Sequence, residues 1–237
     1  MRILKVLAGG LFVIALPVLF GTLSLRWLVA DEGWYQAGFQ KYGGSQRTRI
    51  APEDLARSSE QISSYLVLER DRVDDISVRV DGQTQLLFKD RENRHMEDVR
   101  DLMGGFYRLG MLAGGYLLVY LLAGRYLYPT GFRRELGQKL CWAGGLTLGL
   151  FGGFGVLSLF SFDELFLQFH LVSFDNDLWI LDPTKDNLLM MFPQGFWYDS
   201  AIRLAMATGA QAGAALLAGI LIVRQTGTAL TTKTQSR

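Results

Sequence analysis

Four stretches of the chain are nearly free of charged residues, and each is about 20 residues long. They cover residues 6–25, 104–124, 140–160 and 204–223. A helix of about 20 residues, rising 1.5 Å per residue, crosses the ~30 Å hydrocarbon core of a bilayer. Because lipid offers the backbone no hydrogen-bond partners, these segments must be helical. The sequence therefore predicts an all-α membrane protein built on a bundle of four transmembrane helices.

The first stretch follows two basic residues, Arg2 and Lys5, and this pattern is also found in cleavable signal peptides. The apolar run is long, however, and no clean small-residue cleavage site follows it. We interpret residues 1–30 as an uncleaved transmembrane helix.

Basic residues in the short connections indicate the orientation. The N-terminus, the loop 125–139 and the C-terminal end hold nine basic residues and one acid. The basic residues are Arg2, Lys5, Arg125, Arg133, Arg134, Lys139, Arg224, Lys233 and Arg237. Loops rich in Lys and Arg stay in the cytoplasm. We therefore expect a multi-pass plasma-membrane protein with both termini cytoplasmic.

This orientation divides the chain into eight segments. Transmembrane helices are expected at 1–30, 104–124, 140–160 and 200–224. A cytoplasmic loop is expected at 125–139 and a cytoplasmic tail at 225–237. The extracytoplasmic parts are then a cap at 31–103 and an aromatic-rich segment at 161–199.

The cap reads as a small α+β unit. Pro52 and two following acids are typical of a helix start. Asp81 and Gly82 separate two short β-type runs, which predicts a hairpin. Asp90 is suited to cap a helix that continues into the second span. Inside the membrane, small-residue faces at Gly145, Gly149 and Gly153, and at Ala207, Ala210, Ala214 and Ala218, predict close helix packing.

The chain has only two histidines, His95 and His170. Both fall outside the predicted spans, nine residues before residue 104 and ten after residue 160. Asp98 lies at i+3 from His95 on a predicted helix, where a carboxylate can fix the tautomer of an imidazole. Two unrelated structural histidines would fit the same pattern.

Segment 161–199 holds nine of the 29 aromatic residues. They are Phe162, Phe166, Phe169, Phe174, Trp179, Phe192, Phe196, Trp197 and Tyr198. An interfacial aromatic belt explains part of this enrichment. Asn176, Asp182 and Asp186 lie among the rings, and aromatic walls with a few polar groups are typical of a site that handles lipid.

Several kinds of chemistry are excluded by missing motifs. The sequence has no G-x-S-x-G, no H-E-x-x-H, no Walker loop and no G-x-G-x-x-G. A single cysteine, Cys141, allows neither a disulfide nor a thiol metal site, and the net charge of +1 argues against nucleic acid. We expect no metal and no cofactor. Acid–base work by histidine, or a pair of aspartates, remains.

Two sequence blocks carry a family resemblance. The run from Arg91 to Val99, R-E-N-R-H-M-E-D-V, resembles an H-M-x-D-V signature. The run from Phe169 to Trp197 is similar to the pattern F-H…F-x-N-x-x-W-x-L-D-P-x-x-D-x-L…F-P-x-x-F-W. Both occur in a family of bacterial integral membrane proteins that includes the lipoprotein intramolecular transacylase.

The resemblance implies an acyltransferase that acts within a diacylglyceryl lipoprotein in the bilayer. One acyl chain would move from glycerol to the amine of the N-terminal cysteine, giving an N-acyl lyso-lipoprotein. We predict that His95 and His170 are catalytic and face each other, with Asp98 or Asp182 orienting one of them. The remaining predicted orienting or substrate-binding residues are Phe169, Phe174, Asn176, Trp179, Asp186, Phe192 and Trp197.

Two other interpretations remain open. The protein could be a non-enzymatic membrane accessory protein whose cap binds a partner, with dispensable histidines. It could also be an aspartyl enzyme, for which Asp182 would approach a second carboxylate. We expect a monomer in every case.

Overall fold

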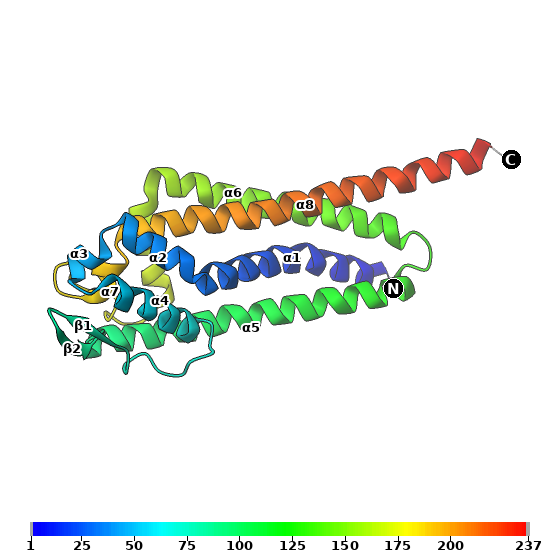
Figure 1. Cartoon of the computed structure of the whole chain (residues 1–237). Helices are drawn as coiled ribbons and strands as arrows, with labels where there is room; N and C mark the ends of the chain where they lie inside the picture. Colours follow the sequence, from blue (N-terminus) through cyan, green and yellow to red (C-terminus); the bar gives the residue numbers. More distant parts are fainter. Residues whose placement is uncertain (1, 236–237) are drawn as a thin grey trace. The chain divides into compact units, whose positions relative to one another are not determined.

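The four long helices are the main feature of the computed structural model, which describes residues 2–235. They are α1 (Arg2–Ala30), α5 (Asp90–Leu127), α6 (Phe132–Ser173) and α8 (Gln194–Gln235) (Figure 1). Among the described residues, these four helices are long and apolar enough to cross a membrane. The predicted all-α membrane fold with four spanning helices is confirmed.

The helix α8 extends past residue 225, where the predicted cytoplasmic tail begins, and continues through Gln235. Residues 236–237 lie outside the described part of the chain.

The chain divides into two units. One contains residues 1–24, 108–156 and 204–237, and the other contains residues 25–107 and 157–203. The first unit therefore holds most of each predicted span. The second holds the predicted cap together with the aromatic-rich segment.

In the first unit, α1 and α5 share an apolar core. Phe12, Leu16, Leu117 and Tyr120 are buried in it. At Gly110 of α5 a Cβ atom would lie 2.3 Å from the hydroxyl oxygen of Thr22, so glycine is needed there for the helices to approach. Close backbone approach at small residues is the usual way in which helices pack in lipid.

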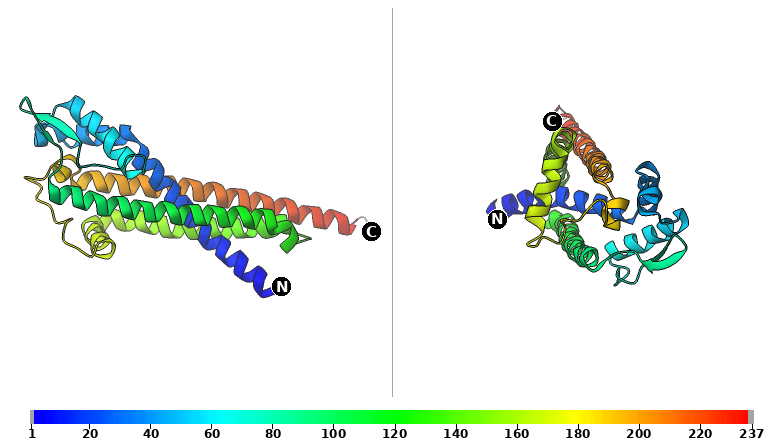
Figure 2. Two further views of the ribbon diagram at one scale, coloured as in Figure 1. Left: turned by 90° about the horizontal axis from the view of Figure 1, so that it is seen from below. Right: turned by 90° about the vertical axis from the view of Figure 1, so that its left-hand side faces the viewer.

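The helices α6 and α8 of the first unit lie side by side, but on different faces from those predicted (Figures 1 and 2). Gly145, Gly149 and Gly153 have nothing within 4 Å of an added Cβ, so this glycine face makes no close contact. The approach occurs at Gly144 and Gly219 instead. Their added Cβ atoms would lie 2.9 Å from the Ala212 oxygen and 2.7 Å from the Gly137 oxygen, respectively. The glycines spaced by four residues do lie on one face of α6, but that face is not the one that contacts α8.

The second unit contains the small elements. They are α2 (Glu32–Lys41), α3 (Gly44–Thr48), α4 (Pro52–Leu66), β1 (Ser77–Val80), β2 (Gln83–Leu86) and α7 (Asn187–Met191). The predicted hairpin is present: β1 and β2 pair antiparallel, and Val80 faces Gln83 across the turn. Asp81 and Gly82 have φ values of 51° and 81°, as a two-residue turn with both central residues left-handed requires.

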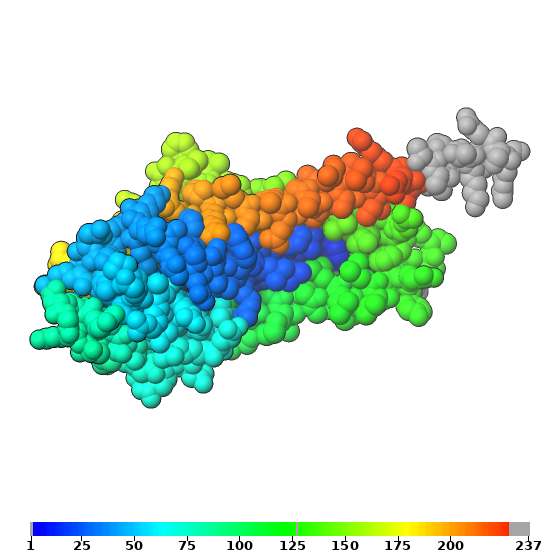
Figure 3. Space-filling model, in the orientation of Figure 1, coloured from blue at the N-terminus to red at the C-terminus, as the bar shows by residue number. Residues whose placement is uncertain are grey.

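The core of the second unit joins these elements to the aromatic-rich segment. Its fully buried members include Ile50, Ile62 and Tyr65 from the cap and Met191 from α7. In the space-filling view, α2, α4 and the hairpin form one continuous surface (Figure 3). The carboxylate of Asp54, only 2% exposed, binds the backbone amide of Arg79 and so fastens α4 to β1.

The helix α6 is interrupted at Ser161, whose φ and ψ are −145° and 38°. This is where the third span was predicted to end. Residues 162–173 are therefore a separate helical segment of the second unit, and His170 lies in its last turn.

Candidate active site

His95 lies in the second turn of α5, and its side chain is buried. The residue is only 6% exposed, and its Nδ1 atom has no hydrogen-bond partner within the described part of the chain. Buried polar atoms are nearly always paired in folded proteins. An unpaired ring nitrogen at this position is therefore suited to bind a group of a substrate.

His170 lies in the last turn of α6 and is 8% exposed. Its Nδ1 atom is 2.7 Å from the main-chain carbonyl oxygen of Phe166, one helical turn earlier. A carbonyl oxygen only accepts hydrogen bonds, so Nδ1 carries the proton in the neutral ring. The lone pair of Nε2 is then available to accept a proton.

The structure brings the two imidazoles together. Their ring centroids are 6.2 Å apart, with 32° between the ring planes. Both residues belong to the second unit, one from each of its two sequence segments.

Aromatic rings surround the pair. Phe174 lies against both imidazoles, with centroid distances of 5.2 Å to His95 and 5.7 Å to His170. Trp179 and Phe169 lie 5.0 Å and 5.3 Å from His170. The predicted residues Phe169, Phe174 and Trp179 therefore lie at the histidines. Phe166, which the predicted set omitted, lies nearer still to His170, at 4.5 Å.

Burial keeps both imidazoles neutral. Burial, which has the largest effect, and the nearby His170 together lower the pKa of His95 to about 4, against the opposing charge of Asp98. Burial also lowers the pKa of His170, against the opposing hydrogen bond to the Phe166 carbonyl. Both rings lie outside the predicted spans. A neutral imidazole has one N–H and one free lone pair, so at neutral pH each ring can donate one proton and accept another.

The predicted orienting carboxylates bind other groups. Asp98 accepts a hydrogen bond of 3.0 Å from the side chain of Asn176. Asp182 accepts the amide and the hydroxyl of Thr184 at 2.8 and 2.6 Å, and pairs with Lys185 at 3.2 Å. Asp98 thus acts on His95 only through its charge, and Asp182 stabilises its own turn.

Asp186 supports the same turn. One of its oxygens accepts the Asp182 amide at 2.7 Å and the other pairs with Lys89 at 3.0 Å. The contacts of Asp182 hold its pKa at about 2, with the hydrogen bonds from Thr184 contributing most. The four carboxylate oxygens of Asp182 and Asp186 thus all contact amide, hydroxyl or lysine donors. None of these contacts joins the two carboxylates through a shared proton, which counts against the aspartyl-enzyme interpretation.

Two predicted residues belong to the core. Phe192 is 2% exposed and packs against Tyr35, Phe39 and Phe196. The indole N–H of Trp197 donates to the Phe192 carbonyl at 3.0 Å, and its ring lies 6.2 Å from that of Phe166. Trp197 therefore packs against Phe166 on one side and is hydrogen-bonded to Phe192 on the other, and so links the aromatic rings around the histidines (the aromatic shell) to the core.

Glu92, which is fully buried in the first turn of α5, was not among the predicted site residues. Asp90 was expected to cap this helix, but Asp90 is its first residue and the Glu92 carboxylate accepts the amide of Lys89. The signal was present, because a glutamate three residues after the cap commonly binds the cap amide. Phe166 could have been found from its position one turn before His170.

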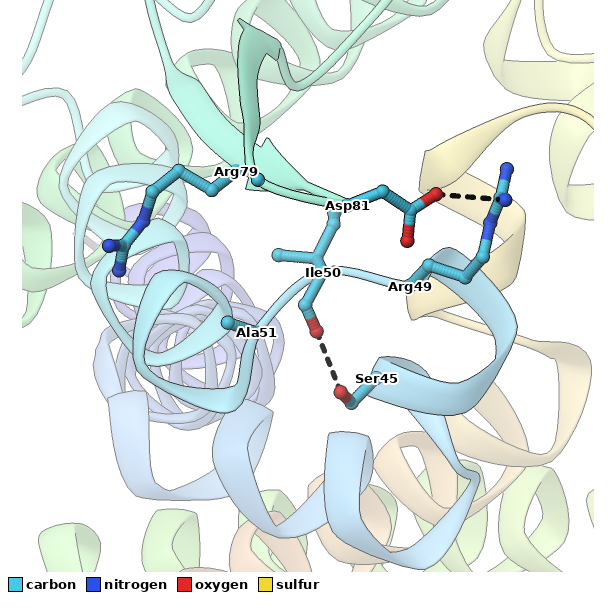
Figure 4. Close-up of a pocket in the computed structure, with 7 residues that line it drawn as sticks. Ser45, Arg49, Ile50, Ala51, Arg79 and Asp81 are labelled. Carbon is cyan, nitrogen blue, oxygen red and sulfur yellow. Dashed lines mark hydrogen bonds and ion pairs between the residues drawn. The ribbon is translucent and has the colours of Figure 1, made fainter.

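Two surface pockets are lined by residues other than the two histidines. One, of about 370 Å³, is lined by Ser45, Arg49, Ile50, Ala51, Arg79, Asp81 and Gly82. In it Arg49 pairs with Asp81, while Arg79 points away from this pair (Figure 4). The other, of about 670 Å³, adjoins the α6 interruption and the start of α8. No group of three or more metal-ligating side chains occurs among residues 2–235.

These features define a membrane-integral helical protein with a buried histidine pair in an aromatic shell. Residues 10–197 match the profile of the family described as lipoprotein intramolecular transacylase Lit. The chain belongs to this family.

Solved structures share this fold, and part of the chain is similar in sequence to a further protein. The in meso structure of the membrane-integral lipoprotein intramolecular transacylase Lit from Bacillus cereus has a TM-score of 0.73 and 16% identity, covering 99% of this chain and all of that one. A variant of that protein with one histidine replaced by alanine has a TM-score of 0.71, 15% identity and coverage of 95% and 96%. An uncharacterized protein of Aquifex aeolicus is 29% identical over 136 residues, which span 57% of this chain and 55% of that protein.

Proposed function

We propose that the protein is a membrane acyltransferase acting within a diacylglyceryl lipoprotein. It moves one acyl chain from the middle glycerol oxygen to the α-amine of the N-terminal cysteine and releases an N-acyl lyso-lipoprotein. Membership of the transacylase family supports this reaction. The observation that carries the catalytic part is the 6.2 Å separation of the His95 and His170 rings inside an aromatic shell.

The reaction needs no stored acyl group, because the donor ester and the acceptor amine belong to one molecule. The enzyme must hold the two ends of a flexible lipid together, and good orientation of this kind supplies about 7–11 kcal/mol. An aromatic shell suits the acyl chains, since it excludes water and binds apolar surface without charge.

His170 is the better candidate for the base. With Nδ1 donating to the Phe166 carbonyl, its Nε2 atom accepts a proton from the amine as the N–C bond forms. The tetrahedral carbon then expels the glycerol oxygen as the C–O bond breaks, and the proton passes to that oxygen. The exchange therefore consumes no further reactant.

His95 is the better candidate for stabilising the oxyanion. Its neutral ring carries one N–H, and its Nδ1 atom has no partner within the described part of the chain. A fixed donor in a buried site stabilises developing negative charge strongly. The neighbours Asp98, Asn176, Phe169, Phe174 and Trp179 would orient the histidines or contact the lipid. Asp182, Asp186, Phe192 and Trp197 would support them.

We further propose that the site faces the extracytoplasmic side of the plasma membrane. The nine basic residues of the N-terminus, the loop 125–139 and the C-terminal end favour a cytoplasmic location for these three parts. The second unit, which contains both histidines, then lies outside. We expect the enzyme to act as a monomer.

The test is replacement of each histidine by asparagine in the full-length protein. His95→Asn and His170→Asn should each reduce the yield of N-acyl lyso-lipoprotein, measured by mass spectrometry, by at least about 100-fold. Gln168→Ala, an exposed change on the same segment as His170, is the control. Full activity in either histidine variant would remove that residue from the mechanism. Full activity in both, with activity lost on cap deletion, would support the accessory-protein alternative.

A further inference from the structure

Glu92 is the only acidic residue with an exposure of 0% among those that the structure describes, and both of its carboxylate oxygens are occupied. Oε2 accepts the backbone amide of Lys89 at 3.0 Å, at the start of α5. Oε1 accepts the backbone amide of Leu188 at 2.7 Å, in the first turn of α7. The first amides of any helix have no partner within the helix. One side chain therefore satisfies amides at the starts of two helices.

One of these helices, α5, carries His95, and the other, α7, is joined by a loop to the segment that carries His170. On α5, His95 follows Glu92 by three residues, so the two side chains are neighbours on one helix face. On the other side, a linking loop (residues 175–186) leads from His170 and Phe174 to α7. Trp179, which lies against His170, belongs to this loop.

The linking loop and α7 are tied to the start of α5 at several points. The Arg91 side chain donates to the Asp177 carbonyl, and Asn176 donates to Asp98. Lys89 pairs with Asp186 at 3.0 Å. These side chains are partly or fully exposed, and exposed pairs contribute little to stability. The Glu92 connection is buried, so water cannot compete for it.

We propose that Glu92 is a positioning residue for the acyl transfer, holding the start of α7 and the linking loop against α5 so that His95 and His170 keep their separation. This inference rests on the proposed function. Its basis is that misplacing a catalytic group by about 1 Å can reduce a rate by 10²-fold.

Only a carboxylate fits both contacts. The two amides of Lys89 and Leu188 both donate, so both side-chain oxygens must accept. In Glu92→Gln one oxygen becomes an NH₂ group, which would place a donor against a donor. The shape of the side chain is kept, so the substitution changes the hydrogen bond and not the packing.

The test compares Glu92→Gln with Glu97→Gln in the full-length protein. Glu97 is exposed on the same helix, and its replacement changes the net charge equally. Two quantities are measured: kcat and KM on a synthetic diacylglyceryl lipopeptide, and the ¹⁵N signals of the two histidines, which are the only ones in the chain. Glu92→Gln should reduce kcat by about 10–100-fold with a smaller change in KM. It should also change the ¹⁵N chemical shifts of the two imidazole rings. Glu97→Gln should change neither.

A second variant covers the case in which Glu92→Gln does not fold. Replacing Leu188 with its α-hydroxy analogue converts one amide to an ester and removes the N–H that Glu92 accepts, while every side chain is kept. It should lower kcat and move the histidine signals in the same direction. An unchanged kcat, or a lower kcat with unmoved histidine signals, in the variant that folds would overturn the inference. The signals need no acyl transfer, so a wild type without activity would reject the proposed function and leave the positioning test intact.

Discussion

The Nδ1 atom of His170 lies 2.7 Å from the carbonyl oxygen of Phe166, and this contact fixes which nitrogen of the ring is protonated. We expect the ¹⁵N spectrum of the protein at pH 7 to show a protonated Nδ1 and an unprotonated Nε2 for His170. With only two histidines, Asn variants of each assign the signals directly. An unprotonated Nδ1 would exclude His170 as the base in the form proposed.

The low pKa of His95 predicts acid-sensitive folding. The pKa is about 4 in the folded protein, against about 6.5 in an unfolded chain. The unfolded chain therefore binds more protons as the pH falls, and the free energy of unfolding decreases with it. The contribution is fully present above pH 6.5 and lost by pH 4.

For this single group the loss amounts to about 2 kcal/mol by pH 5. Unfolding in detergent at pH 7.5 and pH 5 measures it. The His95→Asn variant lacks the titrating group, so its stability should change less between the two pH values than that of the wild type. An equal change in both proteins would show that His95 is not held neutral by the fold.

The four spans and the hairpin could be predicted because they depend on local patterns. A charge-free run of 20 residues must be helical in lipid, and Asp81-Gly82 accepts the positive φ values of a tight turn. The packing faces of α6 and α8 were not predictable in this way. Gly144 and Gly145 are adjacent in sequence, and only the neighbouring helix decides which one lies at the contact.

The candidate site shows the same division. The aromatic residues near His170 were found from their density in segment 161–199, and Phe192 was included although it belongs to the core. Glu92 was not selected, because its second partner is the Leu188 amide, far away in sequence. Asp182 was predicted to orient a histidine because it lies among aromatic residues in the sequence, but its carboxylate contacts Thr184 and Lys185 in its own turn.

Asp182 provides a prediction that separates turn stability from catalysis. In Asp182→Asn the remaining oxygen can still accept the Thr184 amide and hydroxyl, and only the exposed pair with Lys185 is lost. Acyl transfer should therefore stay within about threefold of the wild type, measured as product yield by mass spectrometry. A loss approaching 10²-fold would mean that Asp182 orients an imidazole.

Phe174 should matter for both stability and activity, because its ring lies against both imidazoles. The residue is 8% exposed, and Phe174→Ala should cost about 3–5 kcal/mol of unfolding free energy through the cavity it leaves. Phe174→Leu fills most of that space and should cost less. If Phe174→Ala unfolded with the stability of the wild type, the ring would not be part of the packed shell.

The fastening of the cap hairpin by Asp54 gives a prediction away from the histidines. Its Oδ2 atom accepts the backbone amide of Arg79 at 2.9 Å and the Nε of the same residue at 3.0 Å. In Asp54→Ala these hydrogen bonds are lost and the strand amide has no replacement partner. The unfolding free energy should fall by about 2–3 kcal/mol.

The matched control is Arg49→Ala, which breaks the Arg49–Asp81 pair beside the same hairpin. Both of its side chains are well exposed, at 71% and 63%, so the loss should not exceed about 1 kcal/mol. Thermal unfolding in detergent and amide hydrogen exchange in β1 measure the two effects. Because burial sets the difference between the pairs, equal losses in the two variants would show that the Asp54 carboxylate is solvated in the folded protein.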